Sequence, residues 1–133
     1  MKNLKNKKGF TLIELIVVIA ILGILALFLV PQFMGYSQDA KNQVAQANAR
    51  TVWTSAKAAE TSSEYKEFTD ATFVKEINDK LGSSFTDVAK GTGNNSVDFD
   101  TDYHVSSVTY TTNGVTCTYN GVAFSKSCGG TLD

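Results

Sequence analysis

The sequence predicts an α+β fold in which one long N-terminal helix packs on a C-terminal antiparallel β-sheet of three to four strands. Three observations predict this fold. Residues 10–30 are almost all apolar, and Glu14 is the only charged residue among them. Small residues then recur at heptad-like spacing from Ala45 to Ala59. Two Asn-Gly dipeptides, which are strong signals for two-residue hairpin turns, lie close together at 113–114 and 120–121.

The length and charge of the chain limit its function classes. A chain of 133 residues has room for a membrane helix and one modest globular domain. Its formal charge is −1, and without residues 1–9 the chain has eight basic and 13 acidic residues, a charge of −5. A protein that binds nucleic acid shows a basic face. Because this chain is acidic beyond residue 9, we expect no direct nucleic-acid partner.

The N-terminal region predicts a helix that spans a membrane. A helix over residues 10–30 rises roughly 30 Å, which is about the thickness of the bilayer hydrocarbon core. The leader 1–9 is basic, with four lysines, so the positive-inside tendency places it in the cytoplasm. In a secretory signal peptide the apolar region precedes the cleavage site, whereas here it follows Gly9. Cleavage after Gly9 therefore leaves the membrane helix on the mature chain.

Glu14 is unusual in such a helix. A carboxylate costs about 2.5 kcal/mol or more at the bilayer centre and less near the edge. Either Glu14 lies close enough to the interface to reach water, or it has a partner of opposite charge.

The basic leader, Gly9, Phe10, Glu14 and the apolar helix together resemble the processing motif of type IV pilins and pseudopilins. The resemblance implies that a prepilin peptidase cuts between Gly9 and Phe10 and methylates the new amino terminus of Phe10. It also implies that Glu14 neutralises the amino group of Phe10 in a neighbouring subunit. Opposite charges attract strongly at low dielectric, and neither is tolerated unpaired in an apolar filament core.

The resemblance and the composition together predict three parts of the chain. We expect a cleaved leader over residues 1–9, a transmembrane and assembly helix over 10–34, and a globular domain over 35–133. Pro31 removes a backbone donor, so we expect a kink or a partly melted turn around residues 30–35, or a simple helix end. Many type IV pilins carry a proline at this place.

Beyond Pro31 the helix is expected to continue to about residue 61 as an amphipathic helix. Its narrow stripe of small residues allows a sheet to lie close, and it consists of Ala45, Ala49, Val52, Ala56 and Ala59. Trp53 is the expected anchor of that packing.

Residues 61–96 connect the helix to the sheet. Apolar residues every four positions predict a short helix over 70–81, with Thr69 or Asp70 as its N-cap and Gly82 at its end. The polar residues 83–95 predict an exposed loop.

The two Asn-Gly turns predict a β-meander. The first turn pairs Tyr110 with Cys117, and the second pairs Cys117 with Phe124 and Tyr119 with Val122. An earlier strand is expected over residues 97–105. A shift in the apolar phase before Val108 predicts a bulge at 106–107.

Cys117 and Cys128 are the only cysteines, and both lie in the part expected to be exported, where a disulfide persists. A bond between them requires the chain to fold back at 127–130, which Gly129 and Gly130 permit. Many type IV pilins join their C-terminal region with one disulfide, so the resemblance favours this bond. Reduced cysteines are the alternative, with Cys117 as a core residue.

No catalytic or metal-binding arrangement is apparent. Asp98, Asp100 and Asp102 alternate like the first ligands of a calcium loop, but Tyr103 stands where a glycine is required and no glutamate follows. This pattern matters because major pseudopilins of type II secretion carry a calcium site near the C-terminus. His104 is the only histidine, which excludes a histidine cluster within one chain. We expect no enzyme, no cofactor and no metal.

The sequence therefore favours a structural subunit, a major type IV pilin that assembles into a homopolymer for adhesion, twitching motility or DNA uptake. The resemblance implies several partners: the prepilin peptidase, the pilus assembly platform with its ATPases, and the cytoplasmic membrane before assembly. The finished filament would lie at the cell surface. Two alternatives stay open, a pseudopilin of a type II secretion or competence system and a membrane-tethered binding module.

Overall fold

The computed structural model describes residues 9–132, so most of the basic leader, with its four lysines, lies outside the described residues. The chain divides into two compact units, Met1–Ser37 and Gln38–Asp133. Each unit is described by itself below.

Helix α1, Leu12–Ser63, supplies the described helical part of the first unit and the first element of the second. Residues 30–35 are all helical, so the partly melted turn and the helix end considered at Pro31 are both wrong. Loss of one backbone hydrogen bond at Pro31 is tolerated because good helix formers lie on both sides of it. The kink at Pro31 stays a prediction.

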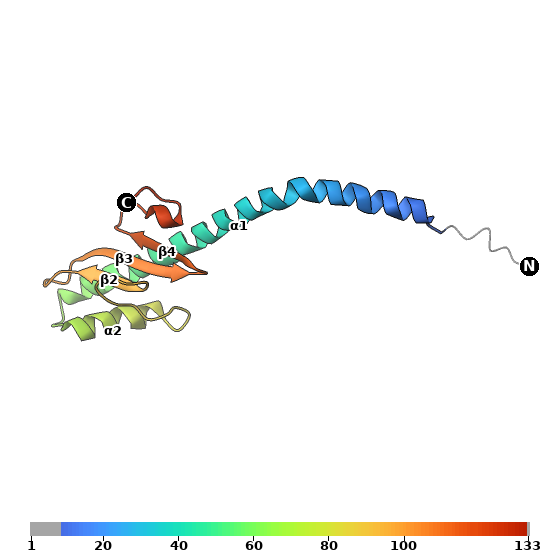
Figure 1. The fold of residues 1–133 in the computed structure, drawn as a ribbon. Helices are drawn as coiled ribbons and strands as arrows, with labels where there is room; N and C mark the ends of the chain where they lie inside the picture. The colour runs from blue at the N-terminus through green and yellow to red at the C-terminus, as the bar shows by residue number, and fades with distance from the viewer. Residues whose placement is uncertain (1–8, 133) are drawn as a thin grey trace, which may run out of the picture. The chain divides into compact units, whose positions relative to one another are not determined.

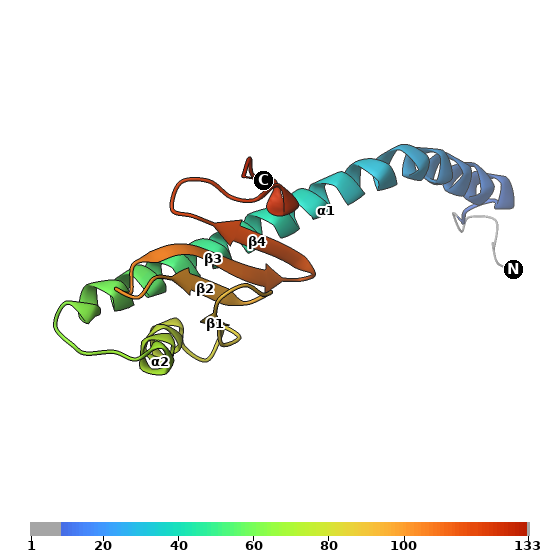
Figure 2. The same ribbon diagram turned by 60° about the vertical axis from the view of Figure 1, so that its left-hand side comes forward.

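The second unit places a four-stranded sheet on the C-terminal half of α1 (Figures 1 and 2). The five small residues of the predicted stripe are all fully buried, which confirms the amphipathic reading of this half. The sheet order is β1-β2-β3-β4, and the described elements after α1 are α2 (Asp70–Leu81), β1 (Ala89–Lys90), β2 (Ser96–Phe99), β3 (Val105–Thr112), β4 (Val115–Tyr119) and the 3₁₀-helix η2 (Lys126–Cys128). The predicted α+β fold is confirmed.

Helix α2 begins and ends where its capping residues predict. Thr69 and Thr72 form a capping box, in which each side chain accepts a hydrogen bond from the other's backbone N–H. Gly82 follows the last residue with φ of 81°, a conformation that favours glycine. The buried side of α2 presents Phe73 and Ile77 to the core.

Strand β1 corrects the prediction of an exposed loop over residues 83–95. It pairs in parallel with β2, whereas the other strand pairs are antiparallel. The Asn78 side chain of α2 accepts a hydrogen bond from the Val88 N–H at 2.8 Å and donates one to the Val88 carbonyl at 3.1 Å. These two bonds fix the chain just before β1, and a two-residue strand is too short to produce a periodic pattern.

The first predicted hairpin is confirmed, because Tyr110 pairs with Cys117 and Thr112 pairs with Val115. The predicted bulge also lies in the expected place. Asp98 pairs with Ser107 and Phe99 with Val105, which leaves Ser106 as the extra residue. Strand β2 is shorter than expected and ends at Phe99.

The second predicted hairpin is wrong. Tyr119 pairs with Phe124 rather than with Val122, and Cys117 does not face Phe124. The reason is the side chain of Asn120, whose Oδ1 accepts hydrogen bonds from the N–H groups of Val122 and Ala123. This Asx turn makes a four-residue loop, and Val122 is 89% exposed at its tip.

Candidate processing and assembly site

The predicted processing residues lie at the start of α1. Phe10 precedes the helix and is 82% exposed, and Gly9 has open space around its Cα. The Thr11 N–H donates to Glu14 Oε2 at 3.0 Å, and the Glu14 N–H donates to Thr11 Oγ1 at 3.2 Å. This reciprocal pair is a capping box, and α1 begins at the next residue, Leu12.

Thr11 is a site residue that the sequence reasoning missed. The signal was present, because a threonine three residues before a glutamate, directly ahead of an apolar run, is the sequence signature of a capping box. The box holds the Glu14 carboxylate at the helix N-terminus, where the helix dipole stabilises negative charge. Glu14 and Phe10 therefore lie at the same end of α1.

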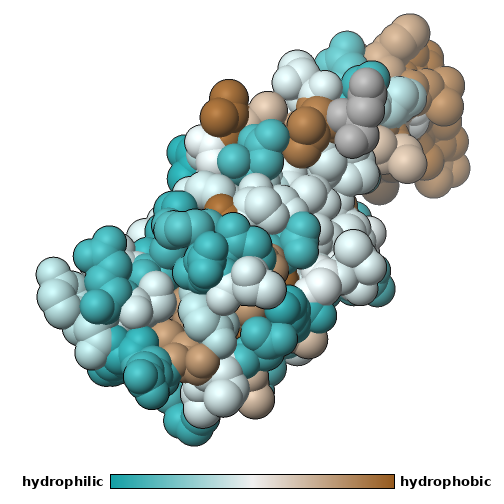
Figure 3. Space-filling view, turned by 90° about the vertical axis from the view of Figure 1, so that its left-hand side faces the viewer, coloured by the Kyte–Doolittle hydropathy of each residue, from teal (hydrophilic) through white to brown (hydrophobic). Residues whose placement is uncertain are grey.

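The apolar side chains of α1 in the first unit are exposed. The large apolar residues from Leu12 to Met34 are about half exposed or more. Figure 3 shows hydrophobic side chains gathered on the N-terminal part of α1, whereas the visible surface of the second unit is mostly hydrophilic. Among the described residues, α1 is the one helix long and apolar enough to cross a membrane. A shallow groove at its start is lined by Phe10, Ile13, Glu14, Val17 and Val18.

In the second unit, the structure contains a disulfide between Cys117 on β4 and Cys128 on η2, with Cα atoms 5.3 Å apart. Both cysteines are fully buried beside Ala45 and Ala49 of α1. The chain folds back through η2, and Gly129 follows it in the left-handed conformation at φ of 86°. Gln46 of α1 donates to the Cys128 carbonyl at 2.7 Å, which ties this segment to the helix.

The three alternating aspartates form a turn in the structure. Asp100 Oδ1 accepts hydrogen bonds from the N–H groups of Asp102 and His104, each at 2.9 Å. The hydrogen bond from the His104 N–H lowers the pKa of Asp100 most, and the bond from Asp102 lowers it further. Within residues 9–132, no group of three His, Cys, Asp or Glu side chains is arranged to hold a metal ion.

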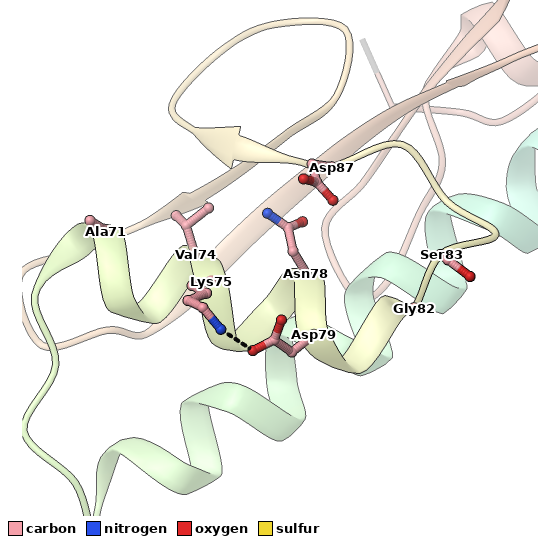
Figure 4. Close-up of a pocket in the computed structure, with 8 residues that line it drawn as sticks. All are labelled: Ala71, Val74, Lys75, Asn78, Asp79, Gly82, Ser83 and Asp87. Carbon is pink, nitrogen blue, oxygen red and sulfur yellow. Dashed lines mark hydrogen bonds and ion pairs between the residues drawn. The ribbon is translucent and has the colours of Figure 1, made fainter.

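A second hollow lies along α2 (Figure 4). Lys75 and Asp79 on its wall form an ion pair at 2.7 Å, and Asn78 is engaged with Val88. The polar groups on this wall therefore stabilise the fold, and we assign them no chemistry.

Known proteins share the N-terminal region that contains Gly9, Phe10 and Glu14. The family described as the prokaryotic N-terminal methylation motif matches residues 4–30. A fimbrial protein of Pseudomonas aeruginosa is 33% identical over 94 residues, which cover 71% of this chain and 60% of that protein. The type IV major pilin protein PilA of Myxococcus xanthus is 40% identical over 53 residues, 40% of this chain and 24% of that protein.

The chain is a type IV pilin-like protein. Pseudopilins are similar to it as well. The type II secretion system core protein G of Vibrio cholerae is 49% identical over 45 residues, which cover 34% of this chain and 31% of that protein. This pilin-like chain spans 60% of the length of the first curated relatives that it matches. No solved structure is significantly similar to it.

Proposed function

We propose that this chain is a structural filament subunit that is cut between Gly9 and Phe10, methylated at Phe10 and assembled through α1. The observation that carries the proposal is Glu14, the only charge in the exposed apolar helix, at the same end of α1 as Phe10. The similarity to fimbrial proteins and to the methylation motif supports it. The chain is divided accordingly into the leader 1–9, the assembly helix 10–34 and the globular domain 35–133.

The proposed role of Glu14 follows from the charges. Cleavage creates a positive amino group at Phe10, next to the capped start of α1. Packing the apolar helices of many copies together removes both charges from water, where each alone is costly and the pair is tolerated. An incoming copy is therefore stable only where its Glu14 meets the amino group of a neighbour. The capping bond from Thr11 keeps the carboxylate at the helix end until then.

The proposed setting is the cytoplasmic membrane before assembly and a cell-surface pilus afterwards. The chain would be a single-pass protein with its basic leader in the cytoplasm. Its partners would be copies of itself, the prepilin peptidase that also methylates, and the assembly platform with its ATPases. We propose the major pilin of a pilus used for adhesion, motility or DNA uptake, and not an enzyme.

The second candidate is a pseudopilin, which the identity with core protein G favours. Electron microscopy of cells with and without this chain separates the two. Long surface filaments that depend on the chain are expected for a pilin, and filaments confined to the cell envelope are expected for a pseudopilin.

The test of processing is the mass and N-terminal sequence of the assembled material. We expect the chain to begin at methylated Phe10. Gly9→Leu should leave uncut precursor in the membrane, whereas Gly35→Leu, at another glycine with open space around it, should be cut normally. Assembled filaments that retain residues 1–9 would overturn the proposed processing.

A further inference from the structure

Arg50 is held in an unusual place for an exposed cation. It is the only arginine in the chain and lies on α1. Its guanidinium carbon lies 5.3 Å from the ring centroid of Phe124 and 5.8 Å from that of Tyr119. The two rings stack on each other, with centroids 4.4 Å apart and planes 21° apart. Cation–π attraction to two fixed rings therefore orders the guanidinium.

The same guanidinium borders a hollow. The hollow has a volume of about 240 Å³ and is lined by Gln43, Gln46, Ala47, Arg50 and Phe124. Among the residues that the structure describes, the Arg50 side chain makes no hydrogen bond and no ion pair, only its two ring contacts. An ordered, planar fork of N–H donors beside amide side chains matches the geometry of a carboxylate.

Unpartnered carboxylates lie at one end of the second unit. Glu64 and Glu67 follow the end of α1, and Asp102 lies in the turn between β2 and β3. These side chains are exposed and make no hydrogen bond or ion pair among residues 9–132. The Phe68 and Tyr103 rings, 6.1 Å apart, bring the two segments together, and Figures 1 and 2 show both at this end. We call these three residues the acidic end.

Arg50 cannot reach the acidic end of its own chain along α1. Glu64 comes 14 residues later in the sequence, and the 13 helical steps from Arg50 to Ser63 alone rise about 20 Å. A contact between the two features therefore has to join different copies. Such a contact uses different surfaces on the two partners, so it does not close into a dimer and can repeat along a filament.

We propose that Arg50, on its platform of Tyr119 and Phe124, binds a carboxylate of the acidic end of a second copy of this chain. Charge complementarity is the argument for this occupant, because the chain without its leader carries a charge of −5 and this arginine is its only guanidinium. The inference rests on the proposed filament assembly and names one contact between the globular units.

The first test uses unmodified protein. Phenylglyoxal reacts with guanidinium groups, and Arg50 is the only one in the chain. We expect modification to be severalfold slower in intact filaments than in the same full-length chain dispersed in detergent. Because salt screens exposed ion pairs, high salt should remove part of this protection. Equal rates in the two states would overturn the inference.

The second test identifies the partner carboxylate. Filaments of Arg50→Lys grown from mixed ¹⁴N and ¹⁵N copies are treated with a carbodiimide, which joins an amine directly to a carboxylate. We expect isotopically mixed links from position 50 to Glu64, Glu67 or Asp102. The pairs Lys57–Glu60 and Lys75–Asp79, each within one copy at 2.7 Å, are internal controls that should give unmixed links.

The outcomes separate the two proposals. Filaments in which position 50 links only within its own copy, or to other carboxylates, would overturn the inference and leave the proposed function intact. If Arg50→Lys assembles poorly, the phenylglyoxal comparison on unmodified filaments decides. If the unmodified chain forms no filaments at all, the proposed function fails and this contact fails with it.

Discussion

At the residue scale, Glu60 organises the end of α1. Its carboxylate accepts hydrogen bonds from Lys57 Nζ at 2.7 and 2.8 Å and from the Val105 N–H at 2.8 Å, and His104 Nδ1 lies 3.6 Å away. Burial by itself raises the pKa of Glu60, but the bonds from Lys57 and Val105, with His104, lower it overall below 4.5. One carboxylate thus joins α1 to the start of β3.

This lowered pKa predicts an acid dependence of stability. A group with a depressed folded-state pKa contributes stability above its unfolded value, here 4.5, and loses it as the pH falls through the folded value. Glu60→Gln should cost about 1–2 kcal/mol at pH 7 in urea unfolding of a fragment that begins at Gln38. Below pH 4.5, the difference in unfolding free energy between Glu60→Gln and the unmodified fragment should shrink.

Glu64→Gln is the control for this measurement, because Glu64 is exposed and makes no ion pair within the described residues. It should change neither the stability at pH 7 nor the acid dependence. If Glu60→Gln destabilises the fragment equally at pH 3 and pH 7, the charge of Glu60 is not the cause.

At the element scale, the elements that the sequence predicts well are those with long or repeated signals. The buried stripe from Ala45 to Ala59 repeats over four helical turns, and α2 has a cap residue at each end. The hairpin at Asn113-Gly114 has the expected register because both turn residues adopt positive φ, 52° and 80°.

The elements that are predicted wrongly from the sequence have local causes. Asn120-Gly121 is the same dipeptide, but the Asn120 side chain accepts hydrogen bonds from the N–H groups of Val122 and Ala123 and so lengthens the loop. Strand β1 depends on one amide, Asn78, ten residues away from Val88. Of the candidate site, the sequence predicts Gly9, Phe10 and Glu14 but not the capping role of Thr11. Which residues a neighbouring copy contacts depends on tertiary packing, as at Arg50, and no local pattern encodes it.

Two loop glycines make a matched test of packing against Trp53. Gly114 and Gly121 have similar φ, 80° and 89°, but a Cβ at Gly114 meets open space whereas one at Gly121 lies 2.6 Å from the Trp53 ring. Gly114→Ala should cost about 1–2 kcal/mol from backbone strain alone. Gly121→Ala should cost a further 1–3 kcal/mol or so, because the ring must move.

Thermal unfolding of the two variants decides between these contributions. Trp53 also packs edge-on against Tyr119 at 5.5 Å, so its fluorescence should shift in Gly121→Ala and stay unchanged in Gly114→Ala. Equal losses of stability in the two variants would show that Trp53 adjusts freely and does not anchor the sheet.

At the scale of the whole molecule, the disulfide closes the C-terminal end of the second unit onto α1. The bond closes a loop of about 12 residues, worth roughly 3 kcal/mol in the chain-entropy account. We expect oxidised protein to melt lower when a reductant is added. A double variant, Cys117→Ala with Cys128→Ala, should melt low in both conditions.

Alkylation of the two thiols, detected as an increase in the mass of the protein, provides an independent check of this bond. Undenatured, unreduced protein from the cell surface should resist alkylation at Cys117 and Cys128. Two freely alkylated thiols, or a melting temperature that ignores reductant, would contradict the proposed oxidised state.

The central claim concerns the whole filament, namely that Glu14 of one copy meets the amino terminus of Phe10 in its neighbour. The most direct measurement is filament yield from cells that express Glu14→Val, with Ile16→Val on the same helix as the control. Glu14→Val should insert and be cleaved after Gly9, since removing a charge makes the membrane a better environment, yet give few filaments because the neighbour's amino group is left unpaired. Ile16→Val should assemble normally. Normal filament yield from Glu14→Val would contradict the claim and leave α1 as an anchor only.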